Sequence, residues 1–333
     1  MELEVSTILN TSPPVTSDGR LRIPRWAAAL CPHPEQPQLL HLKVPDLGAT
    51  LQRCSGSGHN LVSVTLTGVR CLSAAEFQSA VTAAYLTVLS TLSNTHSPHP
   101  IRMWNFIGDI HRPMGPGVDR YRVFNSGRFE AFSQLAGSPG INCERTFVRQ
   151  LPAATGVGET ADEVVIHALG ARSPGAAIEN PLQVPAFAYS TAHGPRPPCF
   201  SRAVIAELEP LNRTTNSRPT LLFSGTASIR GENSTHASDL PAQFDETIRN
   251  IEHLAQSVKH PCRFAISGLE TARIYYPRSA DEQWLRRAAR DRLGPSTFIE
   301  LLPAAICRAE LLIEIEGTIA ATSPRQPTQG PAT

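Results

Sequence analysis

Residues 119–135 read DRYRVFNSGRFEAFSQL and combine cationic and aromatic side chains in one short stretch. Arginines alternate with a tyrosine and several phenylalanines, directly behind the Gly/Pro loop RPMGPG at 112–117. A guanidinium group can bind a carboxylate through two parallel hydrogen bonds, and aromatic rings can form an apolar wall behind such a contact. The pattern therefore predicts a pocket for a small organic anion. The alternative is an exposed arginine-rich loop above a few buried rings.

A second chemical feature is a pair of carboxylates in AELLIEIEGTIA, at 309–320. In a strand, Glu314 and Glu316 would point to one side and Ile313 and Ile315 to the other. Apolar neighbours disfavour the charged form of a carboxyl group, and a second carboxylate nearby does the same. We therefore expect a raised pKa at Glu314, which could donate a proton near neutral pH. The alternative is an edge strand with two solvated glutamates.

Composition excludes several classes of protein. The chain has 333 residues, which suits two domains, and its net charge of +1 gives no general attraction to nucleic acid or acidic membranes. Seven widely spaced cysteines without a CxxC motif predict free thiols in a reducing cytoplasm. The GDIH segment offers Asp109 and His111 but no third metal ligand at a credible spacing. We expect no metal, no cofactor, no nucleic-acid partner and no membrane anchor.

The order of predicted elements repeats along the chain. The first block has a strand at 60–69, a helix behind a Ser73/Glu76 capping box, a strand at 101–107, a short helix at 127–135, and strands at 145–151 and 163–169. The second has a strand at 220–228 ending in a glycine turn, a helix opening near Asp239 and Pro241, a strand at 272–277, a helix capped by Ser279 and Glu282 that stops at Gly294, and strands at 296–303 and 309–320. Both blocks read β-α-β-α-β-β. The fold class expected is α+β, with two such blocks packed together and a pocket between them.

Several segments of the second block resemble the RidA/YjgF family: FSGTASI at 223–229, QFDETIRNIEHLA at 243–255 and LLIEIEGTIA at 311–320. A closer resemblance covers most of the chain. MWNFIGDIH, YRVFNSGRFEAF, FAYSTA, PRPPCFSRA and FSGTASI, in this order, are similar to the chorismatases of the same superfamily. The resemblance implies a degenerate N-terminal RidA-like domain with substrate-binding loops over 1–200 and a C-terminal RidA-like domain over 201–323. The Pro- and Gly-rich segment PRQPTQGPAT predicts a disordered tail over 324–333.

The resemblance also implies the site. Two Tyr–Arg pairs in loop-rich segments, Tyr121 with Arg128 and Tyr189 with Arg202, would hold the two carboxylates of chorismate. Glu314 would protonate the enolpyruvyl methylene, and the chain would release pyruvate.

The resemblance further implies the product type. Gly225, and Cys307 seven residues before Glu314, are typical of chorismatases that form hydroxybenzoate. Members that form a dihydroxy-cyclohexadiene carboxylate have alanine in place of this glycine. The chain is most similar overall to the bifunctional 3-/4-hydroxybenzoate synthases of xanthomonadin pigment biosynthesis. Whether Cys307 acts chemically or shapes the pocket stays open.

Two other functions stay open at this point. A RidA-like imine/enamine deaminase would need an arginine on the strand before EIE, and Arg308 lies too late in the sequence to match it. A non-catalytic sensor of small acids would bind ligand without turnover. The duplicated block predicts a monomer or a weak homo-oligomer.

Overall fold

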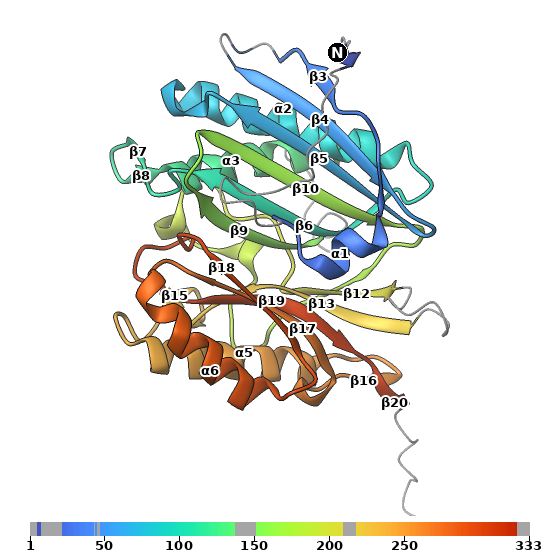
Figure 1. Cartoon of the computed structure of the whole chain (residues 1–333). Coiled ribbons are helices and arrows are strands. Elements are labelled where there is room, and N and C mark those ends of the chain that lie inside the picture. The colour runs from blue at the N-terminus through green and yellow to red at the C-terminus, as the bar shows by residue number, and fades with distance from the viewer. Residues whose placement is uncertain are drawn as a thin grey trace, which may run out of the picture.

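The computed structural model describes residues 5–7, 22–42, 44, 47–136, 151–208 and 218–324. In these residues two large sheets face each other, and helices cover their outer faces (Figure 1). Helices α2 (Ala74–Ser93) and α3 (Arg120–Leu135) cover the first sheet, and α5 (Leu240–Ser257) and α6 (Glu282–Leu293) cover the second. The predicted α+β class is confirmed.

The first sheet has eight strands in the order β1-β3-β4-β5-β10-β6-β9, with β2 beside β4. Strand β10 pairs antiparallel with β5 and β6, while β6 and β9 are parallel. The bounds are β1 Val5–Thr7, β2 His33–Pro34, β3 Gln38–Leu40, β4 Gly48–Ser55, β5 His59–Thr67, β6 His99–Gly108, β9 Ala153–Glu159 and β10 Glu163–Ala171; a small hairpin joins β7 Pro113–Gly115 to β8 Val118–Asp119.

The second sheet has six strands in the order β11-β12-β13-β19-β17-β18. Strand β19 pairs antiparallel with β13 and β17, while β17 and β18 are parallel. The two sheets thus share one pattern, with β10 and β19 in equivalent central positions. The bounds are β11 Ala176–Ile178, β12 Ala203–Leu208, β13 Arg218–Thr226, β17 Leu269–Tyr276, β18 Phe298–Pro303 and β19 Glu314–Ala320; short pairs are β14 Ile229–Arg230 with β15 Asn233–Ser234, and β16 Cys262–Arg263 with β20 Thr322–Pro324.

Three apolar layers hold this arrangement together. One lies between the first sheet and its helices and includes Phe77 and Phe124. Another lies between the second sheet and its helices and includes Phe244. The middle layer joins the sheets through residues such as Trp104 and Leu222. Side chains on the inner faces of the two sheets therefore surround any cavity that lies between the halves.

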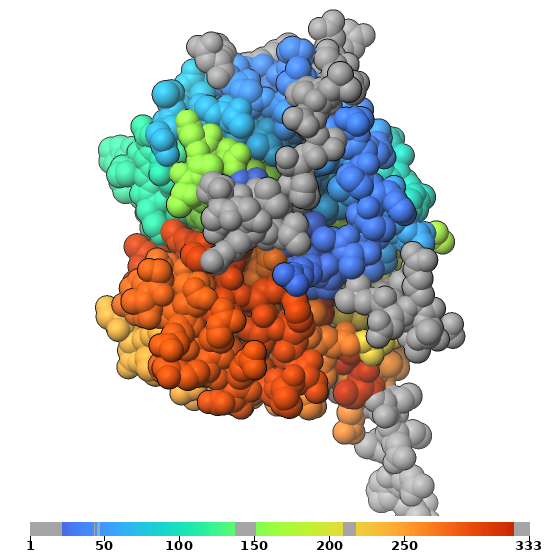
Figure 2. All heavy atoms as spheres, in the orientation of Figure 1, coloured from blue at the N-terminus to red at the C-terminus, as the bar shows by residue number. Residues whose placement is uncertain are grey.

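The segment at 22–30, between β1 and β2, contacts both halves. Helix α1 (Arg25–Leu30) lies at the junction of the halves, where Trp26 packs on Trp104. Arg22 pairs with Glu163, and Arg273 of the second sheet donates to the backbone carbonyl of Arg22. Figure 2 shows the halves in broad contact on this face of the molecule.

Some sequence predictions held and others did not. The Ser73/Glu76 capping box and the Asp239 cap of α5 are confirmed. The capping role of Ser279 is wrong, because Ser279 begins a separate 3-10 turn (Ser279–Asp281) and its side chain caps nothing. Gly225 lies inside β13 rather than in a turn after it.

The prediction of a short helix at 127–135 placed its start too late. Helix α3 begins at Arg120, where the Asp119 carboxylate accepts a hydrogen bond from the Arg122 backbone N–H at 2.9 Å. Tyr121 therefore lies on a helix and not in a loop. The strand predicted at 145–151 and the tail at 324–333 lie almost wholly outside the described residues.

Strand β9 was missed because Gly156 and Gly158 weaken the strand signal of its sequence. No helix in the described part of the chain is long and apolar enough to cross a membrane.

Candidate active site

A cavity of about 440 Å³ lies between the two halves. This is within the range of about 300–1000 Å³ that is usual for small-molecule sites. All seven residues singled out from the sequence line it, and they come from both halves: Tyr121, Arg128, Tyr189, Arg202, Gly225, Cys307 and Glu314. Residues nearly two hundred positions apart therefore meet in one cavity.

The first Tyr–Arg pair is held by helix α3. Tyr121 and Arg128 are two turns apart, so their side chains share one face of the helix. The helix lies close against α2 because Gly127 has no side chain; a Cβ there would lie 2.7 Å from the Gln78 carbonyl oxygen. Burial raises the pKa of Tyr121, so its hydroxyl keeps its proton and can donate it in a hydrogen bond.

The second pair lies on irregular segments before β12. Arg202 donates to the Tyr189 hydroxyl at 2.7 Å and to the Val184 carbonyl at 2.9 Å. Its backbone carbonyl accepts from the Ser224 N–H at 2.9 Å, which fixes this arginine against β13. The guanidinium group of Arg202 lies 5.6 Å from the Tyr189 ring centroid.

Phe200 links the two pairs. The guanidinium carbons of Arg128 and Arg202 lie 5.6 and 5.4 Å from the centroid of its ring. Arg128 and Arg202 are only 2% and 4% exposed, yet the Nε atom of each has no hydrogen-bond partner among the described residues. Buried donors of this kind are costly unless they meet an acceptor, so the pair is suited to anionic oxygens.

Charged side chains around the cavity add to this preference. Arg122 and Arg308 line it as well, and among the described residues the acidic side chains in the lining are Glu314, Asp119 and Glu310. Asp119 is engaged at the start of α3, and Glu310 accepts from the Ser234 hydroxyl at 2.7 Å. The described lining therefore favours a small organic anion.

Glu314 is the first residue of β19 and is 4% exposed. Burial raises the pKa of its carboxyl group to about 8, while the positive charges of Arg102 and Arg202 act in the opposite direction. The expectation of a protonated carboxyl group near neutrality is thus supported, and solvated glutamates are excluded. The expected contribution of a like charge is not seen, because the neighbouring Glu316 forms an ion pair with Arg102.

Gly225 and Cys307 both contact this carboxyl group. A Cβ at Gly225 would lie 1.8 Å from Glu314 Oε1, so only glycine leaves the acid where it is. The Cys307 thiol donates to Glu314 Oε2 across 4.0 Å. Burial raises the pKa of the Cys307 thiol to about 12, and Glu314 adds to the rise, so the sulfur stays protonated and is a poor nucleophile.

Comparison with known proteins identifies the family. A model described as chorismatase FkbO/Hyg5-like, N-terminal, matches residues 56–170. A 3-hydroxybenzoate synthase from Streptomyces hygroscopicus is 35% identical over 249 residues, which cover 73% of this chain and 70% of the relative. The chain belongs to the chorismatase family. A chorismatase from Streptomyces rapamycinicus is 29% identical over 250 residues, covering 73% of this chain and 71% of the relative.

A crystal structure of a chorismatase matches with a TM-score of 0.68 and 26% identity, over 81% of this chain and 77% of the other. The protein is therefore an enzyme of the chorismatase family, and the cavity between its halves is the candidate active site.

Sequence reasoning missed several residues of this chorismatase site. Arg102, Trp104 and Thr155 all donate to the carboxylate of Glu316, two residues beyond Glu314, and were not selected as site residues. A signal existed for Arg102, because a charged residue inside the apolar strand IRMWNFI must find a buried partner. Among the described residues no cluster of three or more metal-ligating side chains occurs.

Proposed function

We propose that the enzyme converts chorismate to pyruvate and 3-hydroxybenzoate, with 4-hydroxybenzoate as a further product, without a cofactor. The names of the relatives, a chorismatase and a 3-hydroxybenzoate synthase, support the substrate and the first product. The observation that carries the proposal is a buried Glu314, whose pKa burial raises to about 8, in a cavity that also holds two Tyr–Arg pairs. Chorismate carries a carboxylate at each end and an acid-labile enol ether between them, which fits this arrangement.

Binding would use the unsatisfied donors of the arginines. Arg128 with Tyr121, and Arg202 with Tyr189, would each hold one carboxylate through charge-assisted hydrogen bonds. The Phe200 ring between the arginines would keep water from the apolar ring of the substrate. Held at both ends, the substrate would present its enolpyruvyl group to a fixed acid.

Glu314 would then donate its proton to the terminal methylene of the enolpyruvyl group. The carbon that bears the ether oxygen becomes oxocarbenium-like, and the bond from that oxygen to the ring weakens. The ring hydroxyl oxygen would attack the ring carbon that loses pyruvate, which forms a protonated three-membered cyclic ether. Cleavage of the bond from this oxygen to its original ring carbon would leave it as the 3-hydroxy group, and cleavage of the new bond would leave it as the 4-hydroxy group. The proton released as the ring becomes aromatic balances the proton that Glu314 supplied. The atoms of chorismate are therefore fully accounted for by pyruvate and hydroxybenzoate, and the reaction consumes no water.

Gly225 and Cys307 would direct this outcome by shape. Gly225 leaves room for the carboxyl group of Glu314, and the protonated Cys307 fills the space on its other oxygen. Close packing of these two residues around the carboxyl group leaves no room for water, which favours attack by the ring hydroxyl oxygen of the substrate. We assign to Cys307 this steric role rather than a nucleophilic one, because its thiol stays protonated.

The finer architecture belongs to the same proposal. The matching strand orders of the two sheets favour two RidA/YjgF-like units, at 1–200 and 201–323, with the active site between them. Synthesis of both hydroxybenzoates, as in the xanthomonadin type, is the version we favour from overall sequence similarity.

The first test incubates purified enzyme with chorismate, follows pyruvate with lactate dehydrogenase and separates the aromatic products by chromatography. We expect pyruvate in equal amount to hydroxybenzoate. Binding of chorismate without pyruvate would indicate a sensor, and ammonia from 2-aminoacrylate would indicate a deaminase. Either result would overturn the proposal.

The second test is Glu314→Gln, with Glu270→Gln as the matched control because Glu270 forms an exposed pair with Arg218. General acids contribute about 10²–10⁴-fold to rate, so kcat should fall by at least about 100-fold while chorismate still binds. Because the active form is protonated, wild-type kcat/KM should fall about tenfold per pH unit above the Glu314 pKa of about 8. A variant that keeps more than about a tenth of the rate, roughly 1.4 kcal/mol of barrier, would refute the assignment.

A further inference from the structure

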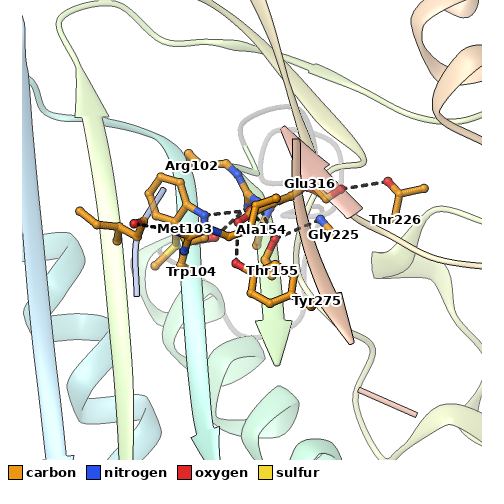
Figure 3. Close-up of polar contacts among 12 residues, drawn as sticks. Arg102, Met103, Trp104, Ala154, Thr155, Gly225, Thr226, Tyr275 and Glu316 are labelled. Atoms are coloured by element: carbon orange, nitrogen blue, oxygen red, sulfur yellow. Dashed lines mark hydrogen bonds and ion pairs between the residues drawn. The ribbon is translucent and has the colours of Figure 1, made fainter. Parts of the chain in front are cut away.

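The carboxylate of Glu316 lies two residues beyond the acid on the same face of β19 and is 1% exposed. It accepts hydrogen bonds from four side chains that reach it from β6, β9 and β17 (Figure 3). Trp104 Nε1 and Thr155 Oγ1 each donate to Oε2 at 2.8 Å, and the Tyr275 hydroxyl donates to Oε1 at 2.6 Å. The fourth donor is the guanidinium group of Arg102, which forms a close ion pair with Oε2.

All four partners donate, so the network is built for a carboxylate ion at this position. Among the described residues Glu316 is the ion-pair partner of Arg102, which also donates to the Met103 carbonyl at 2.8 Å and stacks over the Trp104 ring at 4.9 Å. Glu316 is therefore the group that neutralises a deeply buried cation directly beside the acid.

Thr155 ties this network to the place where Glu314 lies. Its hydroxyl donates to Glu316 and accepts from Arg102 at 2.5 Å and from the Gly225 backbone N–H at 3.1 Å. Gly225 is the residue that leaves space for Glu314 Oε1. The hydroxyl of Thr155 thus links the carboxylate of Glu316, through hydrogen bonds, to the backbone of Gly225, which contacts Glu314.

We propose that Glu316 is a positioning residue for Glu314: by neutralising Arg102 and anchoring Thr155, it keeps the acid protonated and holds it against Gly225. The proposal rests on the proposed role of Glu314 as the general acid. Without the negative charge of Glu316, Arg102 would be an unpaired cation that favours the ionised, inactive form of Glu314.

Other charged or titratable groups also surround Glu314. They come from α3, β6, β17, the segment before β12 and the loop between β18 and β19: Tyr121, Arg102, Tyr275, Arg202 and Cys307, with Arg273 next to Tyr275. Tyr121, Tyr275 and Cys307 are neutral at physiological pH because burial raises their pKa values. Arg273 is held by Glu300 and by the Ile23 carbonyl. Arg273 lies opposite Glu316 in the sheet but pairs with Glu300, so among the described cations around Glu314 it is Arg102 that forms the ion pair with Glu316.

The test measures the pH at which kcat/KM for chorismate falls by half, in a set of charge variants. In Glu316→Gln this midpoint should move down by about one unit or more, which is the usual effect of one nearby charge. Arg102→Gln should move it up, because a cation that favours ionisation is lost. The double variant Arg102→Gln/Glu316→Gln should return the midpoint towards the wild-type value, and Glu270→Gln should leave it unchanged.

A structural role alone would lower activity without these opposite, compensating shifts. Unchanged midpoints in folded Glu316→Gln or Arg102→Gln would overturn the proposal, as would a double variant that keeps the shift of one single variant. Should Glu316→Gln fail to fold, the Arg102→Gln and double variants still give signed results, since removing a buried pair together is often tolerated.

Infrared titration of the Glu314 carboxyl group tests this proposal independently of the proposed catalytic function. The carboxylic-acid C=O band that disappears in Glu314→Gln reports protonation of Glu314 directly, whatever its role in turnover. In Glu316→Gln that band should be lost at lower pH than in the wild type. If Glu314 proves not to be the acid but the band still shifts, the network is correct and only the catalytic assignment fails; an unshifted band refutes the network itself.

Discussion

Replacing Gly225 with alanine tests the fit around the acid most directly. The new Cβ would lie 1.8 Å from Glu314 Oε1, 2.6 Å from Cδ and 3.2 Å from Cγ. Real Cβ contacts are essentially never shorter than 3.0 Å, so the carboxyl oxygen must retreat by about 1.2 Å or β13 must move. The backbone cannot move easily, because the Gly225 N–H donates to Thr155 and the flanking Ser224 hydroxyl accepts from the Ala154 N–H at 2.8 Å.

The expected result of Gly225→Ala is therefore a displaced acid. A misplacement of about 1 Å can lower a rate by about 10²-fold, equivalent to about 2.7 kcal/mol. We expect the rate of hydroxybenzoate formation to fall by this amount while KM changes little, since the arginines are untouched. Residual turnover should shift towards the dihydroxy-cyclohexadiene carboxylate, because a moved carboxyl group no longer closes the wall against water.

The assay quantifies pyruvate and separates the ring products of wild type, Gly225→Ala and Gly115→Ala. Gly115 is the matched control, because a Cβ there meets nothing within 4 Å and the residue lies outside the cavity. Melting curves establish that each variant is folded. Hydroxybenzoate formation within about threefold of wild type in folded Gly225→Ala would refute the argument from close contact.

Two further predictions concern binding and stability. Arg128→Ala and Arg202→Ala should each raise KM by about 10- to 100-fold, because a hydrogen bond to a charged group contributes about 1.5–3 kcal/mol; unchanged KM in both would exclude the two carboxylate clamps. Ser73→Ala should lower the free energy of unfolding by about 1 kcal/mol through loss of the α2 cap. Ser279→Ala, which removes no cap, should leave it nearly unchanged in denaturant melts, and equal losses in both would contradict the assigned helix starts.

The elements with strong local signals could be predicted from sequence. Helices α2 and α5 have clear caps and apolar periodicity, and β6 and β17 are apolar and bounded. The start of α3 was not predictable in the same way, because its first turns carry Arg120 and Arg122, which give no apolar stripe. Arg120 is nevertheless fully buried, where it donates to the Gly108 carbonyl at 2.8 Å. Only the tertiary fold supplies that partner.

Some residues of the site could likewise be predicted from sequence, and others could not. The type and sidedness of Glu314 follow from strand alternation, and family resemblance selected the Tyr–Arg pairs. The partners of Glu316 come from strands far away in sequence, at 102, 155 and 275. A single sequence contains no signal for such long-range polar contacts except that a buried charge requires one. The shared contact of both arginines with Phe200 is likewise a product of packing.

The two sheets have equivalent central strands, yet they contribute different chemistry to the space between them. On β10 the side chains on the face of Val165 and Leu169 are Glu163, Val165, His167 and Leu169, whereas β19 presents Glu314 and Glu316. Burial lowers the pKa of His167 to about 3, so that ring is neutral and bonds Ser63 at 2.6 Å. The acid on the central strand of the first half, Glu163, is engaged in an ion pair with Arg22, and this half supplies Arg102, Tyr121 and Arg128 to the surroundings of Glu314. Because Glu314 comes from one half, whereas Arg102, Tyr121 and Arg128 come from the other, the proposed proton-donating site exists only where the halves meet.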